Sequence, residues 1–157
     1  IGPGVFAGYY DNPEANAKAF RDGWFRTGDL GHMDEEGFVY ITGRASDMYI
    51  SGGENVYPAE VESVLHQLAA VAEAAVIGIP DDYRGEAAKA FIKLRDGEKA
   101  FTIDELRAFL TGKLGKHELP AAVEFVAELP RTPVGKLSRH ELRQQPPKTS
   151  QAKSVVQ

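Results

Sequence analysis

The chain has 157 residues, 43% of them hydrophobic, so it can form a domain with a core and is neither disordered nor fibrous. Its net charge of −5 argues against nucleic acid as a partner, because a basic face would be needed. It has no cysteine, which excludes disulfide scaffolds, thiolate metal sites and cysteine nucleophiles. The four histidines lack metal-ligand spacing, and no apolar run approaches the roughly 20 residues that span a bilayer.

The first third of the chain predicts a short helix and a β-hairpin. Asp11-Asn12-Pro13 indicates a turn, and a short helix is predicted from Pro13 to Phe20. Residues 24–33 and 38–42 are predicted strands, and residues 34–37 connect them. An isolated hairpin is only marginally stable, so we expect this part to pack on a neighbour or on another copy. The chain opens without an initiator methionine, and we expect it to be a piece of a longer protein.

The rest of the chain predicts a self-sufficient domain. A helix is predicted from Pro58 to Leu68, because its apolar residues follow helical spacing. The nearly continuous apolar run 71–79 predicts a strand buried on both faces, and the alternating run 88–94 predicts a half-exposed one. The further expected elements are a helix opened by a Thr102–Glu105 capping box and stopped at Gly115, a third strand over 121–129, a loop over 130–136, and a short helix from Ser138 through Leu142.

These elements predict an α+β fold, with a sheet of about three strands and helices packed on it. The expected boundaries are residues 1–45 for the β-hairpin part and 46–145 for the sheet domain. Residues 146–157 are rich in Gln, Pro, Lys, Ser and Thr, and we expect a disordered tail there.

Three short motifs carry candidate chemistry. Thr27-Gly28-Asp29 offers a carboxylate, whose two acceptor oxygens suit the vicinal hydroxyls of a ribose. Arg44 offers a planar guanidinium that suits phosphate or hydroxyl oxygens, and Gly52-Gly53 follows it. Pro133-Val134-Gly135-Lys136 presents a cation on a glycine-containing loop. Each motif alone has a plain structural alternative: a strand-end turn, a surface ion pair, a tight hairpin, or an exposed loop lysine.

In this order, the three motifs resemble the C-terminal end of the adenylate-forming superfamily, which comprises acyl-CoA synthetases, amino-acid-adenylating domains and beetle luciferases. The resemblance covers roughly residues 1–143 and is closest to bacterial acyl-CoA synthetases for medium- or long-chain fatty or dicarboxylic acids. It implies that residues 1–45 are the tail of a large N-terminal domain and that residues 46–145 form a small C-terminal lid.

The resemblance also implies roles for residues near the domain junction. Asp29 grips the ribose of the adenylate, and Arg44 contacts the ribose or phosphate of the nucleotide. Ser46 and Asp47 form the hinge about which the lid swings. The family usually has Asp or Lys where this chain has Ser46, but a hinge needs only to absorb a change in backbone angles.

The same resemblance implies a CoA-binding face. Gly52, Gly53 and Glu54 correspond to the strand and turn that line the pantetheine tunnel, where a side chain at Gly53 would obstruct a thin ligand. Tyr83 and Arg84 lie on a loop where relatives often contact the nucleotide end of CoA, although this loop varies.

Lys136 is the expected catalytic residue. In the family, this lysine bridges the acyl carboxylate and the nucleotide, where negative charge crowds the transition state. The surrounding motif also resembles the site at which bacterial members are acetylated, which would remove the charge.

Together these features predict an ATP-dependent, AMP-forming acid:CoA ligase of the bacterial cytoplasm, with ATP, CoA and a fatty or dicarboxylic acid as substrates. The Mg²⁺ would be held by the N-terminal domain, so this chain alone is expected to be inactive. A lysine acetyltransferase and deacetylase are the expected regulatory partners. The alternatives are the lid of an amino-acid adenylation domain, a luciferase-like oxygenase, or a non-catalytic binding or acetylation-substrate module.

Overall fold

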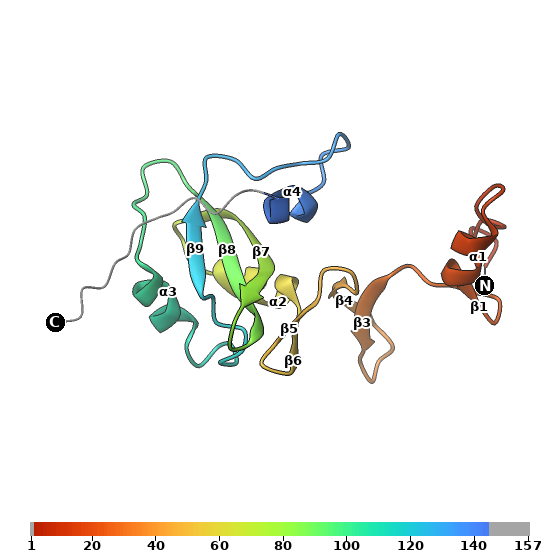
Figure 1. Ribbon diagram of the computed structural model, residues 1–157, viewed down its shortest axis with the longest axis horizontal. Coiled ribbons are helices and arrows are strands. Elements are labelled where there is room, and N and C mark those ends of the chain that lie inside the picture. The colour runs from red at the N-terminus through yellow and green to blue at the C-terminus, as the bar shows by residue number, and fades with distance from the viewer. Residues whose placement is uncertain (1, 145–157) are drawn as a thin grey trace.

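The computed structural model describes residues 2–144, so the predicted tail over 146–157 lies outside the described residues. We call residues 2–45 the N-terminal segment and residues 46–144 the C-terminal unit. The elements of the N-terminal segment are α1 (Pro13–Ala19), β1 (Phe20–Arg21), β2 (Trp24–Phe25), β3 (Asp29–Met33) and β4 (Val39–Arg44). The chain therefore begins with small, separate elements (Figure 1).

Strands β3 and β4 form the predicted antiparallel hairpin, with Asp29 opposite Arg44. The side chain of Asp34 closes the connection by accepting hydrogen bonds from the backbone N–H groups of Glu36 and Phe38. The prediction of a single strand over 24–33 was wrong, because the chain breaks between β2 and β3 at Gly28, which has a φ of +80°.

The C-terminal unit is built on a five-stranded sheet. Its strands are β5 (Tyr49–Ser51), β6 (Glu54–Val56), β7 (Val71–Asp81), β8 (Gly85–Leu94) and β9 (Ala122–Phe125). The path is β6-β5-β8-β7, and β9 pairs parallel to β8. The α+β class was predicted correctly, but two more strands are present than expected, because β5 and β6 are too short for a clear alternating pattern.

Helices cover both faces of this sheet. Helices α2 (Pro58–Leu65) and α3 (Ile103–Leu110) contribute to one core cluster, and α4 (Arg139–Gln144) contributes Leu142 to the other. Successive residues of β7 point into different clusters: Val76 lies in the first and Ile77 in the second. This strand is therefore buried on both faces, as predicted.

Strand β8 is more buried than its pattern indicated, so the prediction of a half-exposed strand was wrong. Phe91 is only 1% exposed, because Leu129 and Leu142 pack in the same cluster. Lys89 is one of the charged residues that alternate with apolar ones in this run. It forms an ion pair with Glu124 at 2.9 Å, and both side chains are largely buried.

Several element ends differ from the predictions. Helix α2 ends at Leu65, and α3 ends at Leu110 because Thr111 is extended, which is well before Gly115. The predicted capping box of Thr102 and Glu105 is confirmed. Strand β9 is shorter than predicted, and α4 runs from Arg139 to Gln144.

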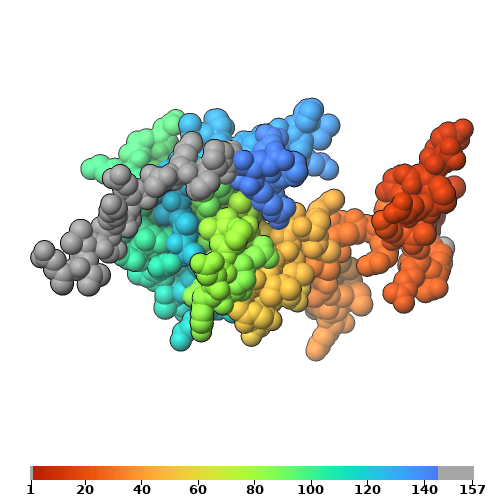
Figure 2. Space-filling model, viewed as in Figure 1, coloured from red at the N-terminus to blue at the C-terminus, as the bar shows by residue number. Residues whose placement is uncertain are grey.

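Burial is unevenly distributed along the chain. No described residue before Tyr49 is buried, and the buried hydrophobic residues all lie between positions 49 and 142. Figure 2 shows the first part of the chain as a separate lobe beside the rest of the molecule. Within residues 2–144, no helix is both long and apolar enough to cross a bilayer.

Candidate functional site

Asp29 and Arg44 lie together at one end of the β3–β4 hairpin. Their cross-strand register brings the Arg44 Nε within 3.0 Å of the Asp29 Oδ1. Both side chains line a hollow of about 290 Å³ between the hairpin and the start of α2, where Tyr57 and Pro58 form part of the wall. A carboxylate and a guanidinium that orient each other in an open hollow form a suitable site for polar ligand groups.

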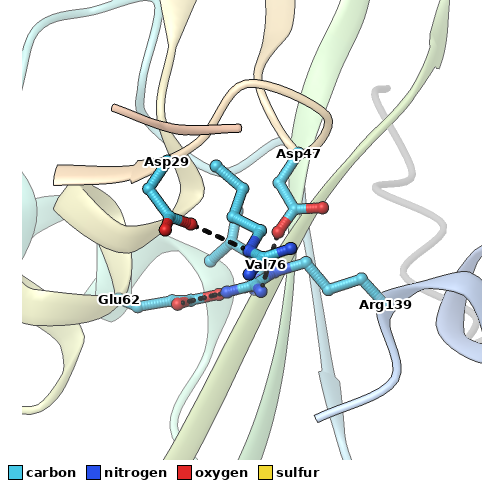
Figure 3. Close-up of polar contacts among 6 residues, drawn as sticks. Asp29, Asp47, Glu62, Val76 and Arg139 are labelled. Atoms are coloured by element: carbon cyan, nitrogen blue, oxygen red, sulfur yellow. Dashed lines mark hydrogen bonds and ion pairs between the residues drawn. The ribbon is translucent and has the colours of Figure 1, made fainter. Parts of the chain in front are cut away.

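Asp47 faces the same hollow and is tied to the C-terminal unit by Arg139 (Figure 3). The Arg139 guanidinium donates to Asp47 Oδ2 at 3.1 Å and to both carboxylate oxygens of Glu62, at 2.8 and 2.7 Å. Glu62 also accepts the backbone N–H of Val76 at 2.8 Å. These contacts join the residue after Ser46 to α2, β7 and α4.

The glycine pair forms the tight turn between β5 and β6. Gly52 has a φ of +62° and Gly53 a φ of +88°, so both adopt left-handed backbone that glycine reaches without strain. A Cβ at Gly53 would meet no atom within 4 Å, so this face of the turn opens to solvent.

The loop between β7 and β8 lies next to this turn. The Gly52 N–H donates to the Arg84 carbonyl at 2.9 Å, and Tyr83 is 95% exposed. The structure thus groups Gly52, Gly53, Glu54, Tyr83 and Arg84 at one end of the C-terminal unit. These are the five residues that the resemblance assigned to a CoA-binding face.

Lys136 lies on a second tight turn, between β9 and α4. Thr132 holds its backbone from two sides: the Thr132 N–H donates to the Lys136 carbonyl at 2.7 Å, and Thr132 Oγ1 accepts the Lys136 N–H at 3.2 Å. Gly135 supplies the left-handed residue of the turn, with a φ of +81°. The Lys136 side chain is exposed, and within residues 2–144 it has no carboxylate partner.

The Lys136 turn and the glycine turn do not meet. The chain just before α4 projects at the opposite end of the C-terminal unit from the β5–β6 turn (Figure 1). The candidate residues therefore form three separate groups: the hollow at the hairpin, the glycine turn with its neighbouring loop, and the lysine turn.

Sequence reasoning missed the side chains that hold these groups in place. Arg139, which is paired with Glu62, binds Asp47, and Arg131, which is paired with Glu73, contacts the lysine turn. Their partners are 58 and 77 positions away in the chain, so no local spacing could have found them.

Comparison with known proteins gives a family match for the C-terminal unit. Residues 60–136 match the family model described as the AMP-binding enzyme C-terminal domain. A long-chain-fatty-acid–CoA ligase of Bacillus subtilis is 51% identical over 141 residues, which is 90% of this chain and 25% of that protein. The chain thus spans about a quarter of the length of this relative.

Solved structures of related enzymes share the fold. ATP-bound MatB from Rhodopseudomonas palustris aligns with a TM-score of 0.84 at 43% identity, covering 91% of this chain and 28% of that one. The o-succinylbenzoate-CoA synthetase of Bacillus subtilis, in complex with its acyl-adenylate intermediate, aligns with a TM-score of 0.83 at 43% identity, covering 92% and 29%. Residues 60–136 therefore carry the C-terminal domain of the AMP-binding enzymes, and the chain is similar to the corresponding part of bacterial CoA ligases.

Proposed function

We propose that this chain is the mobile lid and the adjoining end of the large domain of an ATP-dependent, AMP-forming acid:CoA ligase. The enzyme would join a carboxylic acid to AMP with loss of pyrophosphate, and then transfer the acyl group to the thiol of CoA. The separation of the lysine turn from the glycine turn carries this proposal. Two groups at opposite ends of one domain would reach a single reaction centre one after the other, as the domain turns.

Lys136 would act in the first step. The acid carboxylate attacks the α-phosphorus of ATP, and the bond to pyrophosphate breaks, so negative charge crowds the transition state. A positioned ammonium stabilises that charge. The exposure of Lys136 supports this role, as does the contrast with Arg131 and Arg139, which flank it and are both paired with carboxylates.

Asp29 and Arg44 would bind the nucleotide. A ribose diol can donate two hydrogen bonds to the Asp29 carboxylate, while Arg44 faces a ribose or phosphate oxygen. Their mutual ion pair at 3.0 Å supports this role, because it orients both groups before a ligand arrives. Residues 2–144 contain no group of acidic or histidine side chains that could hold the Mg²⁺ that accompanies ATP, and the N-terminal domain would bind this ion.

The glycine turn would act in the second step. The open space over Gly53 suits the passage of the extended pantetheine arm of CoA, with Gly52 and Glu54 on either side. Tyr83 and Arg84, on the adjacent loop, would contact the nucleotide end of CoA.

The lid would turn about Ser46. On one side, the Ala45 N–H donates to the Gly28 carbonyl at 2.9 Å, which ties Ala45 to the N-terminal segment. On the other side, Asp47 is tied to the C-terminal unit through Arg139. Ser46 lies between these two anchors, where a change in backbone angles would move one part relative to the other.

The acid belongs to the fatty or dicarboxylic class, and the reaction takes place in the bacterial cytoplasm, where ATP and CoA are available. Acetylation of the exposed Lys136 by a lysine acetyltransferase would remove its charge and stop the first step, and a deacetylase would restore it.

The test uses Lys136→Ala in the complete ligase, with Lys99→Ala as the control at another exposed lysine. Pyrophosphate exchange should fall about 10²- to 10³-fold, while thioester formation from supplied acyl-AMP stays near the wild-type rate. The Lys99 variant should match the wild type in both steps. Equal loss of both steps in the Lys136 variant would refute this division of labour.

A further inference from the structure

We infer that Arg131 is a positioning residue for adenylation: it braces the turn that carries Lys136 against strand β7. The Arg131 guanidinium donates from Nη1 to the Gly135 carbonyl at 3.0 Å, and its Nη2 contacts the Glu73 carboxylate. One side chain thus bonds both to the residue that precedes Lys136 and to the sheet. This inference rests on the proposed role of Lys136.

The turn has internal hydrogen bonds, but these do not fix its direction relative to the sheet. Its backbone bonds link Thr132 to Gly135 and Lys136, and its base is closed by the bridge between Arg131 and Leu137. Leu137 packs on the second core cluster, whereas Val134 at the tip is 79% exposed. The Arg131 guanidinium adds a link from the Gly135 carbonyl, next to Lys136, to Glu73 on β7.

Glu73 is itself held in place, which makes it a firm anchor. Lys93 approaches Glu73 at 3.5 Å and binds Glu128 at 2.8 Å, so alternating charges run from Glu128 through Lys93 and Glu73 to Arg131. An arginine suits the end of this row, because its planar fork can bond a carboxylate and a carbonyl simultaneously.

The pair is half-exposed, at 48% for Arg131 and 31% for Glu73, so it contributes little to folding. Its effect on catalysis is larger, because a displacement of a reacting group by about 1 Å can cost about 100-fold in rate. We therefore expect Arg131→Gln to fold normally and to lower adenylation about 10- to 100-fold.

The kinetic test compares both half-reactions in the complete ligase. Arg131→Gln and Glu73→Gln should slow pyrophosphate exchange and leave thioester formation from supplied acyl-AMP unchanged. Glu98→Gln is the matched control, since it removes the same charge at an exposed position outside this row, and should match the wild type. Arg131→Lys, which keeps the charge but loses the fork, should lie between wild type and Arg131→Gln. Equal slowing of both steps by Arg131→Gln would overturn the inference.

A double variant tests whether Arg131 acts through Lys136. Once Lys136→Ala has been introduced, Arg131→Gln should cause no further loss of adenylation. A multiplied loss would contradict a positioning role.

A structural readout separates this inference from the proposed function. In the 157-residue chain, Arg131→Gln should lower the backbone ¹⁵N order parameters of residues 133–136 and leave those of β7 unchanged. Unchanged order at 133–136 would overturn the inference, whatever the activity. If Lys136→Ala leaves adenylation intact, the proposed function fails, and with it the catalytic part of this inference.

Discussion

The N-terminal segment and the C-terminal unit have similar kinds of side chains but bury them very differently. Strand β4 exposes Val39 and Ile41 to 66% each, whereas Val76 on β7 is fully buried. The difference lies in what covers the strands: β3 and β4 form a lone hairpin, while the larger sheet has helices on both faces. A hydrophobic strand thus becomes core only when another layer covers it.

The stability of the described chain therefore resides in the C-terminal unit. The two core clusters of the C-terminal unit supply its stabilising burial, and the N-terminal segment contributes none of the buried side chains. We propose that the exposed face of the β3–β4 hairpin is covered by the rest of the large domain in the complete ligase.

The largest expected effect contrasts two phenylalanines. Phe91→Ala should lower the free energy of unfolding by about 3–5 kcal/mol, because Phe91 is 1% exposed and its truncation leaves a cavity. Phe38→Ala should change it by less than about 0.5 kcal/mol, because Phe38 is 62% exposed. Urea unfolding followed by far-UV circular dichroism measures both. If both variants lost a similar free energy of unfolding, the two regions would not differ in their contribution to stability.

A smaller effect is expected at the junction of the two regions. Arg139→Met should lower the free energy of unfolding by about 1–3 kcal/mol, because it leaves Glu62 and Asp47 without their cation at 13% and 20% side-chain exposure. Asp47→Asn, which leaves the Arg139–Glu62 pair intact, should cost less. Chemical denaturation ranks the two variants, and the opposite order would show that the contact of Arg139 with Asp47 dominates.

The smallest effect at neutral pH is expected at Tyr49, which is 3% exposed and whose hydroxyl has no hydrogen-bond partner within residues 2–144. Tyr49→Phe should be neutral or slightly stabilising at pH 7, within about 0.5 kcal/mol, because it removes a buried polar group that no partner satisfies. Thermal unfolding at pH 7 checks this expectation, and a loss of more than about 2 kcal/mol would mean that the hydroxyl is bonded.

The same residue predicts a dependence on alkaline pH. Burial, followed by the negative charges of Glu118 and Glu86, raises the pKa of Tyr49 above its ordinary value of 10.0. Above pH 10 the unfolded chain releases this proton while the folded chain keeps it, so stability falls with a slope that approaches about 1.4 kcal/mol per pH unit. The wild type should therefore lose stability more steeply than Tyr49→Phe above pH 10. Parallel curves would contradict the buried, protonated phenol.

Much of the fold was predictable because it rests on local patterns. The capping box at Thr102, the hairpin connection at Asp34 and the doubly buried run of β7 each follow from residues close together in the chain. The burial of the middle of β8 was not predictable. It depends on Leu142 packing against Phe91 and on Glu124 neutralising Lys89, and both partners come from distant parts of the sequence.

The candidate site divides in the same way. The motifs that contain Asp29, Gly53 and Lys136 stand out as short stretches with clear chemistry. The supports of that chemistry do not: the Arg139 contacts with Glu62 and Asp47 form only when α4 packs near α2. The motif residues can thus be identified from the sequence, whereas the geometry that holds them requires the fold.

The most direct test of the central claim compares two variants of the complete ligase in both half-reactions. Lys136→Ala should lose adenylation and retain thioester formation from supplied acyl-AMP. Gly53→Leu, which places a side chain over the open face of the glycine turn, should retain adenylation and lose thioester formation. If either variant loses both steps equally while remaining folded, the two turns do not serve the reaction in succession, and the proposal of an alternating lid is contradicted.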